Sequence, residues 1–399
     1  MSSSKHLSLD ETNGVVALCG DSTTDDMDDS SMAQSNLLSI MWCGTAGLGG
    51  HLLGTDEENV VFLKYLVYNV QKNQTIAEFQ YTVRPPPPQS CNNSNGDSSI
   101  DLCNAPIQLS ETCRRDFELT EDRIRSTGQP LEFVLKDMEE KLRSITYCLD
   151  NKLAYSNHHN HHNHQNNISN NNEKALAIIN SSNNNNINKP ILITDGQLHL
   201  RQVLHPKAAF NNLELPETYN KFFDLRKEFR DLYNREEVSS VPEMANFLDI
   251  NTEEHDNLGT RATRSMARII ARMIHDGHTF QGPEQILVKL EPGVVSKGEE
   301  VDNGCVVRAR GLPWMSSDTA IAKFFRGLNV AKGGVALCMS SQGRRNGEAL
   351  IRFLCSEHRD MALRRHKHHM GGRYIEVYKA TGEDFISVAG GNNNEANQF

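Results

Sequence analysis

Near the C-terminal end of the sequence, short apolar segments alternate with helical segments in an order that few folds satisfy. Segments rich in β-branched and other apolar residues predict strands at residues 305–310, 335–339, 348–353 and 373–378. Ser317 and Ser356 can each accept hydrogen bonds from the first turn of a helix, and they predict helices over residues 317–328 and 356–369. The order β-α-β-β-α-β is the ferredoxin-like, α+β arrangement of an RNA recognition motif.

The charge of the chain is divided unevenly between this segment and the rest. The 399 residues carry a formal net charge of −10, which taken alone argues against a nucleic-acid-binding protein. Between Cys305 and Ala380, however, 14 Lys and Arg residues stand against 5 Asp and Glu residues. A basic module of net charge +9 therefore sits in an otherwise acidic chain, and this asymmetry predicts an anionic partner for the module.

The third predicted strand departs from the usual pattern of an RNA recognition motif. The consensus places two exposed aromatic residues on this strand, where this sequence has Glu348 and Leu350. On the first strand, Arg308 stands where an outward aromatic residue is usual. A base stacked on an aromatic side chain contributes about 1–3 kcal/mol, so binding across the face of the sheet is disfavoured.

Planar and cationic side chains are instead concentrated in the loops at one end of the predicted sheet. The candidate RNA-binding residues are Arg310, Trp314, Arg344, Arg345, Arg373 and Tyr374. Aromatic rings and guanidinium groups can sandwich an unstacked base, and an arginine fork matches the O6 and N7 acceptors of guanine. The alternative for Trp314 is packing beneath the first loop, because tryptophan side chains are usually largely buried.

Three stretches of this module carry a resemblance to a known family. The segments VVRARGLPW, GRRNGEALIRF and HRDMALRRHKHHMGGRYIEVYKATGEDF resemble the first quasi-RNA-recognition motif of the epithelial splicing regulatory protein and fusilli family. They are similar, more distantly, to the hnRNP F/H modules. The resemblance implies a nuclear protein that binds single-stranded, G/U-rich pre-mRNA and regulates alternative splicing. It also implies that Arg310, Trp314, Arg344, Arg373 and Tyr374 cage guanines.

The longer N-terminal part of the sequence predicts an α/β domain. Apolar or alternating segments predict strands at residues 37–42, 60–70, 74–83 and 191–194. Helical spacing or composition predicts helices at residues 130–147, 198–206, 221–233 and 261–274. Met266, Ile269, Ile270 and Met273 fall on one face of the last helix, and we assign them to the core.

The family resemblance implies that this domain has an RNase H-like fold of the DEDDh 3′–5′ exonuclease type. Such nucleases need four carboxylates around two metal ions. Trp42 and Gly44 stand in place of the first two acids, His199 lies near the second motif, and His255 and Thr260 align with the third. Asp224 matches an aspartate that is structural in the family. We therefore predict a catalytically inactive domain with no catalytic residue, no metal site and no cofactor.

Composition sets the expected boundaries of these domains. We expect residues 37–280 to form the nuclease-like domain and residues 305–385 the quasi-RNA-recognition motif. The remaining segments are predicted as disordered (1–36 and 386–399), as a linker (281–304) and as an Asn/His-rich insertion (156–189). The clustered histidines of that insertion are compatible with metal binding, but their composition favours a polar surface insertion.

The cysteines and the N-terminus bear on where the protein acts. Nine cysteines, an odd number with no C-x-x-C pair, favour a reducing compartment, and the polar N-terminus does not resemble a signal peptide. The sequence thus predicts an intracellular protein without a membrane span, and the family resemblance implies the nucleus. Because related proteins carry two further motifs of this kind, we expect the chain to be a fragment, a short isoform or an incomplete gene model.

Two other functions remain open at this point. One is an active exonuclease whose RNA module feeds it substrate, which the missing carboxylates oppose. The other is a protein-interaction scaffold, in which the sheet face of the small domain binds peptides or the N-terminal domain binds other proteins. The loop arginines and the +9 charge favour RNA over peptides.

Overall fold

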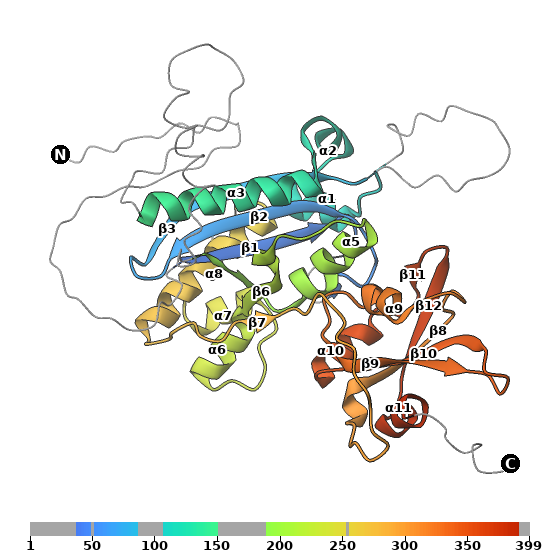
Figure 1. The fold of residues 1–399 in the computed structure, drawn as a ribbon. Coiled ribbons are helices and arrows are strands. Elements are labelled where there is room, and N and C mark those ends of the chain that lie inside the picture. Colours follow the sequence, from blue (N-terminus) through green and yellow to red (C-terminus); the bar gives the residue numbers. More distant parts are fainter. Residues whose placement is uncertain (1–36, 49–51, 87–106, 151–188, 253–254, 391–399) are drawn as a thin grey trace, which may run out of the picture.

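The computed structural model describes residues 37–48, 52–86, 107–150, 189–252 and 255–390, and these form two domains, each built on a β-sheet (Figure 1). The N-terminal segment 1–36, the predicted insertion apart from Lys189, and the residues after Gly390 lie outside the described part of the chain. Among the described residues, no helix combines the length and apolar character needed to cross a bilayer.

The first domain is built on a seven-stranded sheet with the order β4-β3-β2-β1-β5-β6-β7. Its strands are β1 (Leu37–Thr45), β2 (Val60–Asn69), β3 (Gln74–Arg84), β4 (Gln129–Pro130), β5 (Ile191–Thr194), β6 (Lys221–Asp224) and β7 (Glu284–Gln285). Strands β1, β2 and β3 form an antiparallel meander, whereas β5 and β6 continue the sheet in parallel with β1. This order and these directions are those of the RNase H-like fold, as predicted.

Helices cover both faces of this sheet, which explains why β1 and β2 are buried along their whole length (Figure 1). The core on one face is closed by α1 (Glu111–Phe117), α6 (Leu225–Tyr233), α7 (Val241–Phe247) and α8 (Leu258–His275). The core on the other face is closed by α3 (Leu131–Asp150) and by η3 (His199–Leu204), a π-helical segment that continues into α5 (His205–Phe210). The short helices α2 (Glu121–Thr127) and η4 (Glu217–Asn220) complete the domain.

The helix predicted over residues 221–233 is only partly correct, because its first four residues form β6. Phe222 belongs to the core on one face of the sheet and Phe223 to the core on the other, and successive residues reach opposite faces only in a strand. The helix α6 begins after Asp224, whose carboxylate accepts hydrogen bonds from the backbone N–H groups of Arg226 at 2.9 Å and Lys227 at 3.3 Å. Asp224 thus has the structural role that the resemblance implied.

The segment predicted as a linker also contributes to the first domain. Residues Glu284–Gln285 form β7, which pairs antiparallel with β6, and Ile286 is buried. The edge of the parallel strands would otherwise expose unpaired backbone groups, and β7 covers it. The chain then passes through η5 (Asn303–Cys305) into the second domain.

The second domain has the ferredoxin-like fold that the sequence predicted. Its sheet has the order β11-β12-β8-β10-β9. The elements in chain order are β8 (Val306–Arg310), α9 (Asp318–Phe324), β9 (Val330–Met339), β10 (Arg345–Phe353), α10 (Ser356–Leu363), β11 (His368–Met370) and β12 (Arg373–Lys379). Both helices pack on one face of this sheet over a core that includes Val307, Phe325 and Ile351.

A further helix, α11 (Gly382–Ala389), lies on the opposite face of this sheet, and the prediction that the chain is disordered from residue 386 is wrong as far as Gly390. Phe385 of α11 is fully buried against Val306 and Leu350, and Val295 and Val301 pack beside it. Leu350 occupies one of the positions that would otherwise carry an exposed aromatic residue. Because Leu350 stands in place of an exposed aromatic residue, this part of the sheet offers an apolar surface on which α11 packs.

Two buried arginines join the domains. Arg201 of η3 is fully buried and donates to the carbonyl oxygen of Gly327 at 2.9 Å, and to the Glu284 carboxylate at 3.4 Å. Arg365, after α10, donates back to the carbonyl oxygen of Arg201 at 2.8 Å and to the side chain of Gln202 at 2.8 Å. Burial lowers the pKa of Arg365 to about 9, so the guanidinium stays charged at neutral pH.

We expect the Arg365→Met variant to lower the free energy of unfolding by about 3 kcal/mol or more, because buried carbonyl oxygens lose a charged donor. Urea denaturation of the full chain measures this change. Arg344→Met, which makes the same replacement at an exposed loop position, should stay within about 0.5 kcal/mol of the wild type. Equal unfolding midpoints for the two variants would contradict the role of Arg365.

Candidate nucleic-acid interface

The rim of the second sheet carries a row of charged side chains in place of aromatic rings. Arg310 at the end of β8 is paired with Glu348 of β10 on one side and with Glu376 of β12 on the other. The Glu348 carboxylate accepts from Nε of Arg310 at 2.8 Å and from Nη1 of Arg308 at 3.2 Å. Within the described residues, the two Nη groups of Arg310 have no hydrogen-bonding partner, so the arginine fork is available to a ligand.

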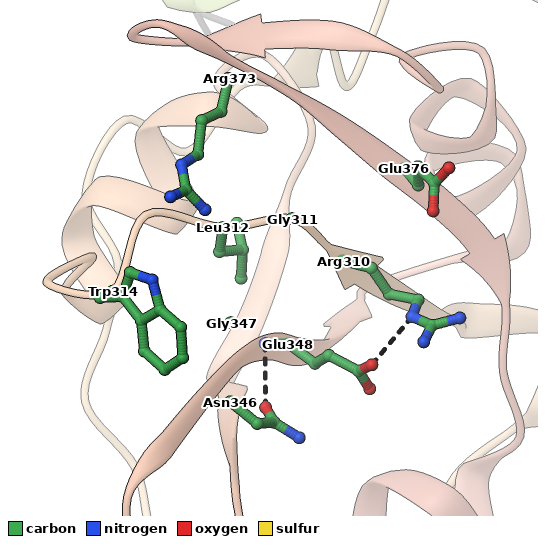
Figure 2. A pocket seen from close by; sticks show the side chains of 9 residues that line it. All are labelled: Arg310, Gly311, Leu312, Trp314, Asn346, Gly347, Glu348, Arg373 and Glu376. Atoms are coloured by element: carbon green, nitrogen blue, oxygen red, sulfur yellow. Dashed lines mark hydrogen bonds and ion pairs between the residues drawn. The ribbon is translucent and has the colours of Figure 1, made fainter.

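A cavity of about 370 Å³ opens at this rim, between the end of the sheet and the loop that follows β8 (Figure 2). Its walls combine a ring, two guanidinium groups, two carboxylates and exposed backbone. The lining residues are Arg310, Gly311, Leu312, Trp314, Asn346, Gly347, Glu348, Arg373 and Glu376. This volume suits a single nucleobase or a small group of similar size.

The loop after β8 is anchored so that Trp314 projects outward. Gly311 adopts a positive φ of 85°, Leu312 is buried, and the Leu312 N–H donates to the carbonyl oxygen of Gly347 at 3.0 Å. Trp314 itself is 60% exposed. The alternative that Trp314 packs beneath the loop is therefore wrong, because Leu312 fills that place.

The structure brings three of the six predicted residues together in the cavity, namely Arg310, Trp314 and Arg373. Arg345 has a different role, since its Nη1 donates to the carbonyl oxygen of Ser316 at 2.7 Å and braces the Trp314 loop. Arg344 and Tyr374 are exposed near the rim but do not line the cavity.

Sequence reasoning missed three polar members of the cavity wall, namely Asn346, Glu348 and Glu376. Glu348 was noticed only as the replacement of an aromatic residue. The signal that could have identified Glu348 and Glu376 is strand alternation, because both share a face with Arg310. Glu376 is also hydrogen-bonded to the Tyr378 hydroxyl, and this bond raises the pKa of Tyr378.

The positions that align with the exonuclease motifs form an apolar cluster in the first domain. Trp42 is buried, with its ring 4.6 Å from the ring of His199. A Cβ atom at Gly44 would meet the ring of Phe117 at 2.5 Å, so no longer side chain fits there without rearrangement. Burial lowers the pKa of His199 to about 4, and its Nδ1 accepts from the Cys43 N–H at 3.2 Å.

The surroundings of this cluster do not fit a divalent metal ion. Thr260 is buried and hydrogen-bonded to Gln80 at 3.2 Å, whereas His255 is exposed. The nearby carboxylate of Asp195 is held by Arg226 at 2.6 Å. In the part of the chain that the structure describes, no three His, Cys, Asp or Glu side chains gather in a group able to hold a metal.

Comparison with known proteins supports the RNA recognition motif fold of the second domain. Residues 307–397 match the family model described as RRM domain. Over 79 residues the chain is 42% identical to heterogeneous nuclear ribonucleoprotein H of Rattus norvegicus and of Homo sapiens. The aligned part covers 20% of this chain and 18% of each relative, so the chain spans less than a fifth of the length of the relatives it matches.

Solved structures resemble each domain separately. A G-rich RNA sequence binding factor 1 from Homo sapiens is 32% identical and covers 21% of this chain and 86% of its own, with a TM-score of 0.20. A 3′-exonuclease solved with a histone mRNA stem-loop is 17% identical and covers 64% of this chain and 89% of its own, with a TM-score of 0.44. The family match shows that residues 307–397 are an RNA recognition motif, and the strand order of the first domain is that of an RNase H-like fold.

Proposed function

We propose that this chain acts in the nucleus as a regulator of alternative pre-mRNA splicing that binds single-stranded, G/U-rich RNA at the rim of its RNA recognition motif. The observation that carries the proposal is the cavity lined by Trp314, Arg310 and Arg373. An exposed indole and two guanidinium groups around a space of this size offer a stack and hydrogen-bond donors to one base.

Guanine is the base that matches the cavity most fully. Its O6 and N7 atoms form adjacent acceptors for the free fork of Arg310. Its N1–H and N2–H groups are donors, and the Glu376 carboxylate in the same wall is an acceptor. The carboxylates also repel phosphate, which favours entry of the base and leaves the backbone to Arg344 outside the cavity.

The role in splicing rests on the relatives and on the family resemblance. The name of heterogeneous nuclear ribonucleoprotein H places that relative in nuclear RNA complexes, and its similarity to this chain is confined to the RNA-binding domain. A single module of this kind is expected to bind RNA with a Kd in the micromolar range, about −8 kcal/mol. We propose that protein partners on the first domain add to this affinity.

The structure disfavours the two alternatives. Peptide binding across the sheet face is opposed by α11, whose Phe385 is buried on that face. Exonuclease activity is opposed by Trp42 and Phe117, which fill the space where metal-binding carboxylates would be required. We therefore propose that the first domain is a scaffold without nuclease activity.

The first test of RNA binding is Trp314→Ala. Loss of one base stack should weaken binding to a short G-rich RNA by about 1–3 kcal/mol, a factor of about 5 to 150. Fluorescence anisotropy with labelled G-rich and C-rich strands measures both affinity and preference. Phe133→Ala removes a ring that is 54% exposed on α3 of the other domain and should leave binding unchanged. Equal affinity of the wild type for G-rich and C-rich RNA would contradict the guanine cavity.

The Glu348→Gln variant tests whether the ion pairs aim Arg310. The glutamine keeps the shape but weakens the bonds to Arg308 and Arg310, so we expect roughly three- to tenfold weaker binding to G-rich RNA. Removal of a negative charge alone would have the opposite effect on an anionic ligand. Tighter binding in an anisotropy titration would therefore show that Glu348 only repels the RNA.

The scaffold proposal predicts that the full chain does not shorten single-stranded RNA in the presence of Mg²⁺ or Mn²⁺. The physical reason is that two divalent ions need several carboxylates to compensate their charge. Denaturing gels of 5′-labelled RNA over a time course make the measurement, and the same reaction with EDTA is the control. Metal-dependent trimming that is absent with EDTA would overturn the scaffold proposal.

A further inference from the structure

A loop of the first domain contacts a hairpin of the second domain, and this hairpin carries Arg373. The loop comprises residues 52–58, between β1 and β2, and the hairpin is formed by β11 and β12. The Glu57 carboxylate accepts from the backbone N–H of His369 at 2.6 Å and contacts Nδ1 of the same residue at 2.8 Å. Next to it, Nε2 of His368 lies 3.1 Å from the carbonyl oxygen of Thr55.

The backbone on both sides of this contact adopts an uncommon conformation. Glu57 has a φ of 56°, and Lys367, at the start of the hairpin, has a φ of 68°. Few residues with a Cβ atom adopt positive φ, and such strain persists only where the surroundings hold it. Lys207 of α5 helps to stabilise the backbone conformation of Glu57, because its Nζ donates to the carbonyl oxygen of Glu57 at 2.6 Å.

The register of the hairpin places the residues that contact Glu57 next to residues at the RNA cavity. His369 pairs with Tyr374, and Met370 pairs with Arg373. Arg373 lines the cavity and Tyr374 is 58% exposed beside it. The residue held by Glu57 is therefore one step along the ladder from the guanidinium that faces the ligand.

We propose that Glu57 is a positioning residue for RNA binding: it clamps the β11–β12 hairpin and thereby fixes Arg373 at the rim of the cavity. This inference rests on the proposed function and assigns the first domain a direct part in it. β11 lies at the edge of the five-stranded sheet, its ladder with β12 is only three residue pairs long, and β12 pairs with β8 only from Glu376 onward, so few hydrogen bonds hold the end of the hairpin that carries Arg373. Ordering it in advance removes an entropic cost that the RNA complex would otherwise bear.

The direction of the change in RNA affinity when Glu57 is replaced distinguishes this clamp from simple electrostatic repulsion. Glu57 and His369 keep 31% and 55% of their side chains exposed, so electrostatic attraction between them is screened by solvent. If Glu57 acted only through its charge, removing it would strengthen the binding of an anionic RNA. The clamp requires the reverse, namely weaker binding when this carboxylate is lost.

The experiment compares RNA affinities of full-length variants by fluorescence anisotropy with a G-rich oligonucleotide. Glu57→Gly removes the clamp and suits the positive φ of this position, so its melting temperature should stay close to that of the wild type. We expect its Kd to rise three- to tenfold. Glu58→Gln removes the same charge from an exposed neighbour that has no hydrogen bond or ion pair to the hairpin among the described residues. This control should bind as well as the wild type or more tightly.

A double-mutant cycle with Arg373→Ala decides whether Glu57 acts through Arg373. In that background, Glu57→Gly should change the Kd less than twofold; a fully additive loss overturns the proposal. Should the glycine variant fail to fold, Glu57→Gln is expected to weaken binding in the same direction. Unchanged or tighter binding by the Glu57 variants, with wild-type binding intact, overturns the clamp alone. A wild type that binds no RNA overturns the proposed function as well.

Discussion

The architecture depends on two arginines that are buried without a fully matching set of negative charges. Arg365 is held by carbonyl and amide oxygens, and Arg201 has one carboxylate, Glu284, at 3.4 Å. A buried guanidinium is tolerated only where its donors are satisfied, and here the acceptors come from both domains. Separation of the domains would leave these donors and acceptors to water, so the acidic domain and the basic domain are held in one arrangement.

The same principle of satisfied polarity explains the unusual sheet of the RNA recognition motif. Once aromatic residues are replaced by Arg308, Glu348 and Leu350, the outer face divides into two parts. The apolar part accepts Phe385 of α11, whereas the charged part forms ion pairs at the rim. Those ion pairs engage Nε of Arg310, and Arg310 lines the cavity. The same replacements therefore remove the aromatic stacking face and place the charged side chains at the rim of the sheet.

Strand and helix patterns predicted both folds because each element buries a local, periodic set of residues. These patterns failed where successive residues are buried on opposite faces of the sheet, or where the partners that bury a residue are distant in the sequence. Phe222 and Phe223 look helical beside Leu225 and Phe229, yet they enter opposite cores. Of the predicted site residues, the cavity contains Arg310, Trp314 and Arg373, because loops at one end of a sheet converge. Strand alternation with Arg310 could have identified Glu376, whereas Asn346 is an exposed polar residue that carries no periodic signal of its own.

Buried side chains occupy positions of the first domain that align with the exonuclease motifs. A site with several carboxylates needs metal ions to offset their repulsion, and it weakens the fold when the ions are absent. Trp42 and Phe117 are part of the hydrophobic core at that position, which stabilises the sheet. The loop that carries Glu57 contacts the β11–β12 hairpin of the RNA recognition motif. Under the proposed clamp, the first domain contributes to RNA recognition by fixing the geometry of its neighbour.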